Sequence, residues 1–269
     1  MTLLALGSAK ASPGVTTTAL ALGAVWPDGP RVTIAEVDPA GGDLAAWLGL
    51  LPEPGLVSLA AAARHEASAH GAAASALLDA HTQRTSGGVR VLLGPSAASQ
   101  AVSALTLLRG GLLGEVAEER DLLVLADCGR LSPASPALPV VERASMVLLV
   151  TRPVAAELGH AAAMAAELRR TQPAVGLILV GRGPYRAEEI SATLGWDVFG
   201  ELPEDRRASA ALAGGGARES ALRRTPLVRA ARGLSAVICS RLAGVPSPSP
   251  ADARSAPPVP VFDASEVRS

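Results

Sequence analysis

The residues with the clearest chemical meaning lie in a short loop near the start of the chain, at 7–14. The loop follows an apolar segment and precedes a segment of helical character that begins at Thr16. Backbone N–H groups at such a helix start point at one spot, and the helix dipole favours negative charge there. Lys10, in this loop, is the only lysine among the 24 lysine and arginine residues of the chain. A compact ammonium suits a phosphate, so we expect a phosphate-binding loop. The alternative is chance placement of one lysine in an arginine-rich chain.

The spacing within the loop departs from the common phosphate-binding pattern G-x-x-x-x-G-K-[ST]. If Thr16 is the Ser/Thr of the pattern, Gly14 falls on its second glycine. Val15 then falls on the lysine and Ala9 on the first glycine, so two of the four key positions differ. The common pattern alone therefore does not account for this loop.

The loop resembles instead the deviant Walker A motif of the MinD/ParA family of P-loop ATPases, K-G-G-V-G-K-T-T. Lys10 corresponds to the signature lysine, while Val15 replaces the second lysine, which in the family reaches the β- and γ-phosphates. The resemblance implies that ATP is bound by the whole loop and the start of the helix: Lys10, Ala11, Ser12, Pro13, Gly14, Val15, Thr16 and Thr17. It also implies that Lys10 is catalytic and reaches the phosphates of a partner subunit.

Two acidic residues end apolar segments that are typical of buried parallel strands. Asp38 follows RVTIAEV, and Asp127 ends DLLVLAD. Ligands lie at the carboxyl ends of such strands. The run EVDPAGGDL resembles the family motif D-x-D-P-x-G-x-x-[LA], with Glu36 as its first acid, and the second run resembles a Walker B strand. The resemblance implies Mg²⁺ held by Thr16, Asp38 and Asp127, with Asp38 also positioning the attacking water. The alternative for both acids is a role in turns.

A third group of residues corresponds to the region of the family that contacts the base. Relatives usually carry an asparagine after the strand expected at 174–180, and here Arg182 lies near that place. The run GELPEDRR resembles the segment G-x-[IL]-P-x-[DE], whose loop packs beside the base. The resemblance therefore implies base contacts from Arg182, Pro203 and Glu204.

Strands and helices alternate along the chain, which predicts an α/β fold with a doubly wound, mostly parallel sheet and helices on both faces. We expect a single P-loop domain over 1–243, followed by a disordered tail rich in Pro, Ser and Ala over 244–269. In detail, we expect an irregular loop over 131–140, one continuous last helix over 220–242, a helix from about 96 to 120, and Asp43 as a helix cap.

Composition narrows the compartment and the partners. The net charge of −1 offers no field that attracts nucleic acid, so DNA is a disfavoured partner although some ParA-like proteins bind it. No apolar run approaches the roughly 20 residues of a membrane span. The two cysteines form neither a CxxC pair nor a Cys/His cluster, which indicates reducing surroundings and a cytoplasmic location.

Three function classes follow. The resemblance implies a homodimerising ATP- and Mg²⁺-dependent switch with slow hydrolysis, acting with a protein partner of a division, partitioning or pilus/secretion system. The altered loop is most similar to the CpaE/TadZ-like branch. The second class is a non-catalytic localisation scaffold, favoured by Val15. The third, a dinucleotide-binding Rossmann enzyme, fails because no G-x-G-x-x-G follows the first strand.

Overall fold

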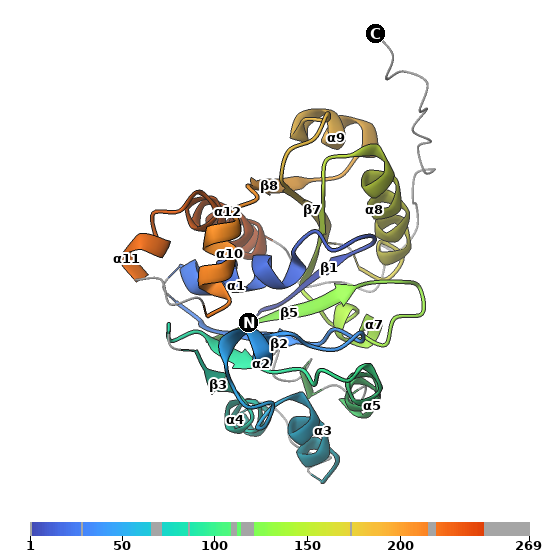
Figure 1. Cartoon of the computed structure of the whole chain (residues 1–269). Helices are drawn as coiled ribbons and strands as arrows, with labels where there is room; N and C mark the ends of the chain where they lie inside the picture. The colour runs from blue at the N-terminus through green and yellow to red at the C-terminus, as the bar shows by residue number, and fades with distance from the viewer. Residues whose placement is uncertain are drawn as a thin grey trace.

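The computed structural model describes residues 2–27, 29–65, 72–85, 87–108, 112–113, 121–172, 174–214 and 219–244. Its centre is an eight-stranded sheet with the order β3-β4-β2-β5-β1-β6-β7-β8 (Figure 1). β3 is antiparallel to its neighbour and the other pairs are parallel. The strands are β1 (Thr2–Ser8), β2 (Arg31–Glu36), β3 (Gln83–Arg84), β4 (Arg90–Leu92), β5 (Leu122–Arg130), β6 (Met146–Thr151), β7 (Val175–Val180) and β8 (Val198–Leu202).

Helices cover both faces of the sheet, as the sequence predicts. They are α1 (Val15–Val25), α2 (Leu44–Leu48), α3 (Leu56–His65), α4 (Ala72–Ala80), α5 (Ala98–Leu108), α7 (Leu138–Val141), α8 (Ala155–Leu168), α9 (Ala187–Leu194), α10 (Arg206–Leu212), α11 (Glu219–Leu222) and α12 (Pro226–Gly244). Successive residues of a strand point to opposite faces. Leu3 and Ala5 accordingly join the cluster with α3, α5 and α8, whereas Leu4 and Leu6 join the cluster with α1, α10 and α12. Figure 1 shows α1, α10 and α12 together on the same side of the sheet.

The strand order brings the predicted site residues to one edge of the sheet. β1 lies between β5 and β6, and β2 lies on the far side of β5. The parallel register pairs Leu6 with Asp127, and pairs Glu36 with the same Asp127 from the opposite side. The loop after β1, the loop after β2 and the end of β5 therefore meet at the carboxyl ends of the strands.

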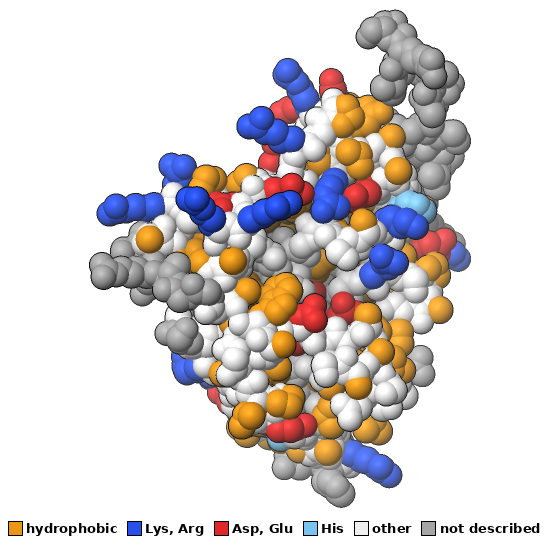
Figure 2. Space-filling view, in the orientation of Figure 1, with side chains coloured by type: hydrophobic (Ala, Val, Ile, Leu, Met, Phe, Trp, Pro, Cys, Tyr) orange, Lys and Arg blue, Asp and Glu red, His pale blue; other side chains and the backbone are white. Residues whose placement is uncertain are grey.

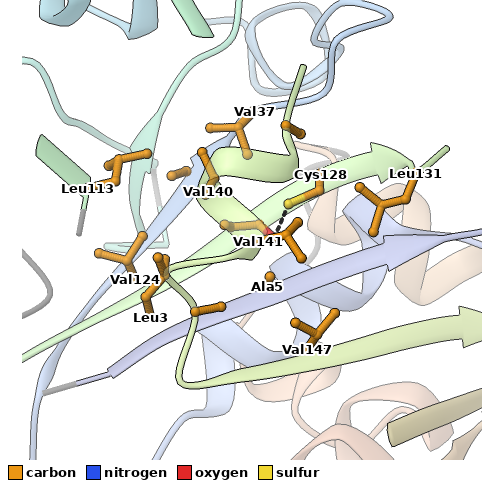
Figure 3. Close-up of a cluster of buried hydrophobic side chains, with 14 of the residues drawn as sticks. Leu3, Ala5, Val37, Leu113, Val124, Cys128, Leu131, Val140, Val141 and Val147 are labelled. Atoms are coloured by element: carbon orange, nitrogen blue, oxygen red, sulfur yellow. Dashed lines mark hydrogen bonds between the residues drawn. The ribbon is translucent and has the colours of Figure 1, made fainter. Parts of the chain in front are cut away.

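The expected irregular loop over 131–140 is only partly irregular, because the short helix α7 forms at its end. Pro139 lies in the first turn of α7, where its missing N–H leaves no hydrogen bond unmade. Val140 and Val141 are buried against Leu3 and Val124 of the sheet (Figure 3). Burial of these valines explains a helix in a segment whose three prolines predict none.

The expected single helix over 220–242 is two helices, α11 and α12. The helical structure is interrupted at Thr225. Its hydroxyl donates to the Leu222 carbonyl at 2.8 Å and accepts from the Val228 N–H at 3.4 Å. Pro226 then begins α12, since a proline is tolerated only in a first helical turn. α5 ends at Leu108, and the expected extension over 109–120 falls largely outside the described residues, as does the tail beyond 244.

Candidate functional site

The loop between β1 and α1 adopts a conformation that glycine normally supplies. Gly14 has φ 96°, and Ala11, which replaces a motif glycine, has φ 58°. A non-glycine residue rarely adopts this left-handed conformation. The Gly14 carbonyl accepts both the N–H and the hydroxyl of Thr18 at 2.8 Å, which fixes the first turn of α1. The loop therefore keeps a defined shape although Ala11 and Ser12 stand where the motif has glycines, and Lys10 and Ser12 are exposed.

Val15 is the first residue of α1, and its side chain is 6% exposed. It packs in the apolar cluster beneath α1, α10 and α12. The position at which the sequence predicts a replaced lysine is thus occupied by a core residue. No cation reaches the loop from this position.

Asp127 is a buried carboxylate with an unused oxygen. Oδ1 accepts the Gly129 N–H at 3.1 Å, whereas Oδ2 has no hydrogen-bond partner among the described residues. Burial raises the pKa of Asp127 to about 6, and the nearby hydroxyl of Thr16 acts against this rise. Buried polar atoms are almost always paired, and Mg²⁺ prefers carboxylate and hydroxyl oxygens. The free oxygen beside Thr16 fits a cation of this kind.

Asp38 lies close to Asp127 and also shapes its own turn. Its Oδ1 accepts the Ala40 N–H at 2.8 Å, so the turn role proposed as an alternative is present. Its carboxylate rests on Gly129, which has φ 57° and no room for a Cβ. Burial and the neighbouring Asp43 raise the pKa of Asp38, while the Ala40 hydrogen bond and the charge of Arg130 lower it. The turn therefore holds the carboxylate over the end of β5.

Glu36 is a site residue that the motif indicates but whose role the sequence does not reveal. Its Oε1 accepts the N–H groups of Asp43 and Leu44 at 2.7 and 2.9 Å, and its Oε2 accepts that of Gly94 at 2.9 Å. Burial raises the pKa of Glu36 to about 7 against these bonds. The signal that could have revealed this role is an acid inside a buried strand, which must find partners.

Asp43 does not cap α2, and that expectation is wrong. Its side chain makes no capping hydrogen bond, and its backbone is helical at φ −109° and ψ −16°. A capping residue needs an extended backbone. The side chain of Glu36 binds the N–H groups at this helix start in its place.

A cavity of about 380 Å³ joins the loop to the region expected to hold the base. The predicted residues that line it are Ser12, Pro13, Gly14, Thr17, Pro203 and Glu204. Arg182 lines an adjoining hollow of about 580 Å³, which shares Pro203 and Glu204. The structure therefore brings the base-contact candidates next to the loop, in two adjacent hollows that share lining residues.

Arg152, directly after β6, also lines the cavity and was not singled out by the sequence. Its guanidinium pairs with Glu157 at 3.2 Å and with Glu204 at 3.3 Å. Gly181 packs against Glu204, so a side chain at 181 would meet that carboxylate at about 3.2 Å. The carboxylate of Glu204, which follows the neighbouring strand β8, therefore lies against the turn at Gly181 after β7. The signal that could have indicated Arg152 is an arginine directly after an apolar run that is typical of a parallel strand.

Figure 2 shows that basic side chains form a band across the upper part of this face, with acidic side chains grouped below them near its centre. Within the described residues, no group of three or more His, Cys, Asp or Glu side chains could hold a metal ion. A Mg²⁺ ion here would need oxygen ligands from Thr16 and from a bound phosphate as well. Among the described residues, none of the helices combines the length and the apolar character that a membrane span requires.

Comparison with family models gives no match for this sequence, and comparison with curated proteins gives none. Solved structures do match. The cell division ATPase MinD of Pyrococcus furiosus superposes with a TM-score of 0.69 at 20% identity, over 89% of this chain and 99% of that one. A ParA family ATPase from Chlorobium tepidum gives 0.68 at 19% identity, over 87% and 98%.

The septum site-determining protein MinD of Pyrococcus horikoshii, in complex with Mg-ADP, gives a TM-score of 0.67 at 19% identity, over 90% and 97% of the two chains. At this level of identity the likeness concerns the fold. The resemblance drawn from the loop and the two acidic motifs is therefore confirmed as a structural one. The chain has the fold of the MinD/ParA ATPases.

Proposed function

We propose that the protein is an ATP- and Mg²⁺-binding molecular switch that pairs with a second copy of itself. The observation that carries this proposal is the unpartnered Oδ2 of buried Asp127 beside Thr16, below a loop that keeps its left-handed residues. An uncompensated oxygen in this position has a physical reason if a cation completes it.

Thr16 and Asp127 would hold the Mg²⁺ ion, with Asp38 close to it. When bound, the ion neutralises charge on the phosphate oxygens. The backbone N–H groups of the loop and Thr17 receive the phosphates, and Lys10, exposed on the loop, reaches those of the partner copy. Asp38 orients a water molecule from its fixed turn. Pro203, Glu204 and Arg182 line the hollows that take the base.

A cytoplasmic switch of this type positions or regulates an assembly, and the candidate partners are components of division, partitioning or pilus/secretion systems. The CpaE/TadZ-like branch is favoured by the altered loop. DNA is disfavoured by the net charge of −1. Residues 1–243 form the switch domain, and 244–269 form a disordered tail.

A second candidate is a scaffold that keeps the fold and has lost turnover. Val15 favours it, since an apolar core side chain replaces the lysine that would neutralise the terminal phosphates. Under this second proposal, wild-type turnover equals that of Asp38→Ala. Turnover that is clear in the wild type and lost in Asp38→Ala rejects the scaffold.

Calorimetric titration of the full chain with ATP and Mg²⁺, and sedimentation velocity with and without both, test the switch. We expect binding that requires Mg²⁺ and a dimer fraction that rises with nucleotide. Lys10→Ala should weaken both together. Lys10→Arg should restore them only in part, because a planar fork does not replace a compact ammonium. Absence of Mg²⁺-dependent binding by the wild type would falsify the proposal.

A further inference from the structure

Arg130 lies at the phosphate loop although no motif of the sequence points to it. It is the last residue of β5, and it pairs with Ser8, the last residue of β1, after a shift of register that follows Leu6. The Leu131 N–H donates to the Ser8 carbonyl at 2.8 Å, which fixes the backbone on the far side of Arg130. The ladder between the two strands thus continues to the point where the loop begins, and it carries an arginine there.

The guanidinium of Arg130 reaches across to the loop itself. Its Nη2 donates to the Ala11 carbonyl at 3.4 Å, a long and therefore weak hydrogen bond. Ala11 lies directly between Lys10 and Ser12, and the side chain of Arg130 is exposed. The same charge acts on Asp38, whose carboxylate lies against the adjacent residue Gly129. Arg130 is therefore close to both the loop and Asp38.

Among the described residues, the guanidinium of Arg130 donates a hydrogen bond only to the Ala11 carbonyl, so most of its donors have no partner there. A guanidinium has five N–H donors, and Arg130 forms no ion pair with a carboxylate within the described part of the chain. Arg152 and Arg206 also lie near the loop, where they line the cavity, and Arg152 is held by Glu157 and Glu204. Arg130 differs from Arg152 in that no carboxylate among the described residues holds its guanidinium, so its donors can turn to a ligand.

We propose that Arg130 binds the phosphate chain of the nucleotide and supplies the positive charge that Val15 removes from the loop. This inference rests on the proposed ATP binding. A guanidinium forms bidentate, charge-assisted hydrogen bonds with phosphate oxygens, which are much stronger than its present bond to a neutral carbonyl. The cation then approaches from the end of β5 instead of from the first turn of α1.

A purely structural role for Arg130, tying down the loop at Ala11, makes different demands on the side chain. Glutamine keeps an N–H donor for the carbonyl and loses the charge. Lysine keeps the charge and loses the fork. Arg84 gives a matched control, because it is exposed and its Nη1 also donates to a backbone carbonyl, that of Gly88 at 3.3 Å.

The test is titration calorimetry of the full chain with ATP and Mg²⁺ for the wild type, Arg130→Ala, Arg130→Gln, Arg130→Lys and Arg84→Ala. We expect the affinity of Arg130→Ala and of Arg130→Gln to fall by roughly 10- to 100-fold, the range for one charged hydrogen bond. Arg130→Lys should recover part of the loss, and Arg84→Ala should bind like the wild type. The salt dependence of binding should weaken in the two uncharged variants.

Two results overturn the inference in different ways. If the wild type binds and Arg130→Ala or Arg130→Gln binds as tightly, the charge of Arg130 is not used, while the proposed function stands. If the wild type does not bind ATP with Mg²⁺, both proposals fail. Melting temperatures without nucleotide should agree among all five proteins, which shows that the variants are folded.

Discussion

Glu36 and Asp127 occupy the same register position on the adjacent parallel strands β2 and β5. Both carboxylates are buried at the end of the sheet where the phosphate loop lies, and the charge of Asp127 contributes to the raised pKa of Glu36. Two acids in neighbouring buried positions are unfavourable for the folded protein alone. The proposed function gives a reason for this arrangement, because Glu36 organises a loop and Asp127 would bind a cation.

The first prediction concerns pH. The pKa of Glu36 is raised from 4.5 to about 7 in the folded protein, so the folded protein binds this proton more tightly than the unfolded chain. The contribution of Glu36 to the free energy of unfolding is then fully present below about pH 4.5 and declines as the pH rises towards 7, by up to about 3 kcal/mol. Glu36→Gln should flatten the decline, measured by urea unfolding at several pH values. The control is Glu188→Gln, an exposed acid, which should keep the wild-type slope.

The second prediction separates stability from binding at Asp127. Asparagine keeps the oxygen that accepts the Gly129 N–H and removes the buried charge. Asp127→Asn should therefore be at least as stable as the wild type at pH 8 without ligand, yet lose affinity for ATP with Mg²⁺ by roughly 10-fold or more. Thermal unfolding and calorimetry give the two values. Asp121→Asn, at an exposed site before β5, is the control and should change neither stability nor affinity. If Asp127→Asn binds ATP and Mg²⁺ as tightly as the wild type, the carboxylate of Asp127 takes no part in binding.

The third prediction tests the strained residue of the loop. Ala11 adopts φ 58°, which costs an L-residue roughly 1–2 kcal/mol. Ala11→Gly should raise the free energy of unfolding by about 1 kcal/mol, after the entropy that glycine adds to the unfolded chain. Ser12→Gly is the matched control, since Ser12 does not adopt a positive φ, and it should not stabilise. A destabilised Ala11→Gly would show that this backbone conformation is not the one in solution.

The fourth prediction concerns the tail. Residues 246–269 are rich in proline and carry no apolar periodicity, so we expect them to bury too little surface to offset the entropy of ordering. Their deletion should leave the melting temperature unchanged within error. A longer deletion from 235 removes the buried Ile238 and should lower it strongly. A drop of several degrees for the short deletion would mean that the tail packs on the domain.

The features that could be predicted from the sequence are local ones. Continuous apolar runs ending in Asp38 and Asp127 are typical of buried parallel strands, and their order after the Lys10 loop was enough to predict the sheet and the residues gathered at its edge. The helix break before Pro226 could also have been predicted, because proline begins helices and does not continue them.

The missed features depend on partners that are distant in sequence. Glu36 takes over the helix start that Asp43 was expected to cap, and one of its hydrogen bonds comes from Gly94, 58 residues along the chain. Arg152 meets Glu204, 52 residues away. Arg130 touches Ala11 across 119 residues. No spacing rule within a segment anticipates such pairs, since they depend on which strands lie side by side.

The three hydrogen bonds of Glu36 also connect two loops to each other. The same carboxylate holds the segment after Asp38 and the turn at Gly94, and the Gly42 N–H donates to the Pro95 carbonyl at 2.8 Å beside it. That turn leads into α5, whose outer face exposes Val102 and Leu107. The Asp38 loop can shift only by breaking these bonds or by carrying the base of α5 with it. A shift of the Asp38 loop would then be transmitted to the start of α5, and a contact made at α5 would be transmitted to the Asp38 loop.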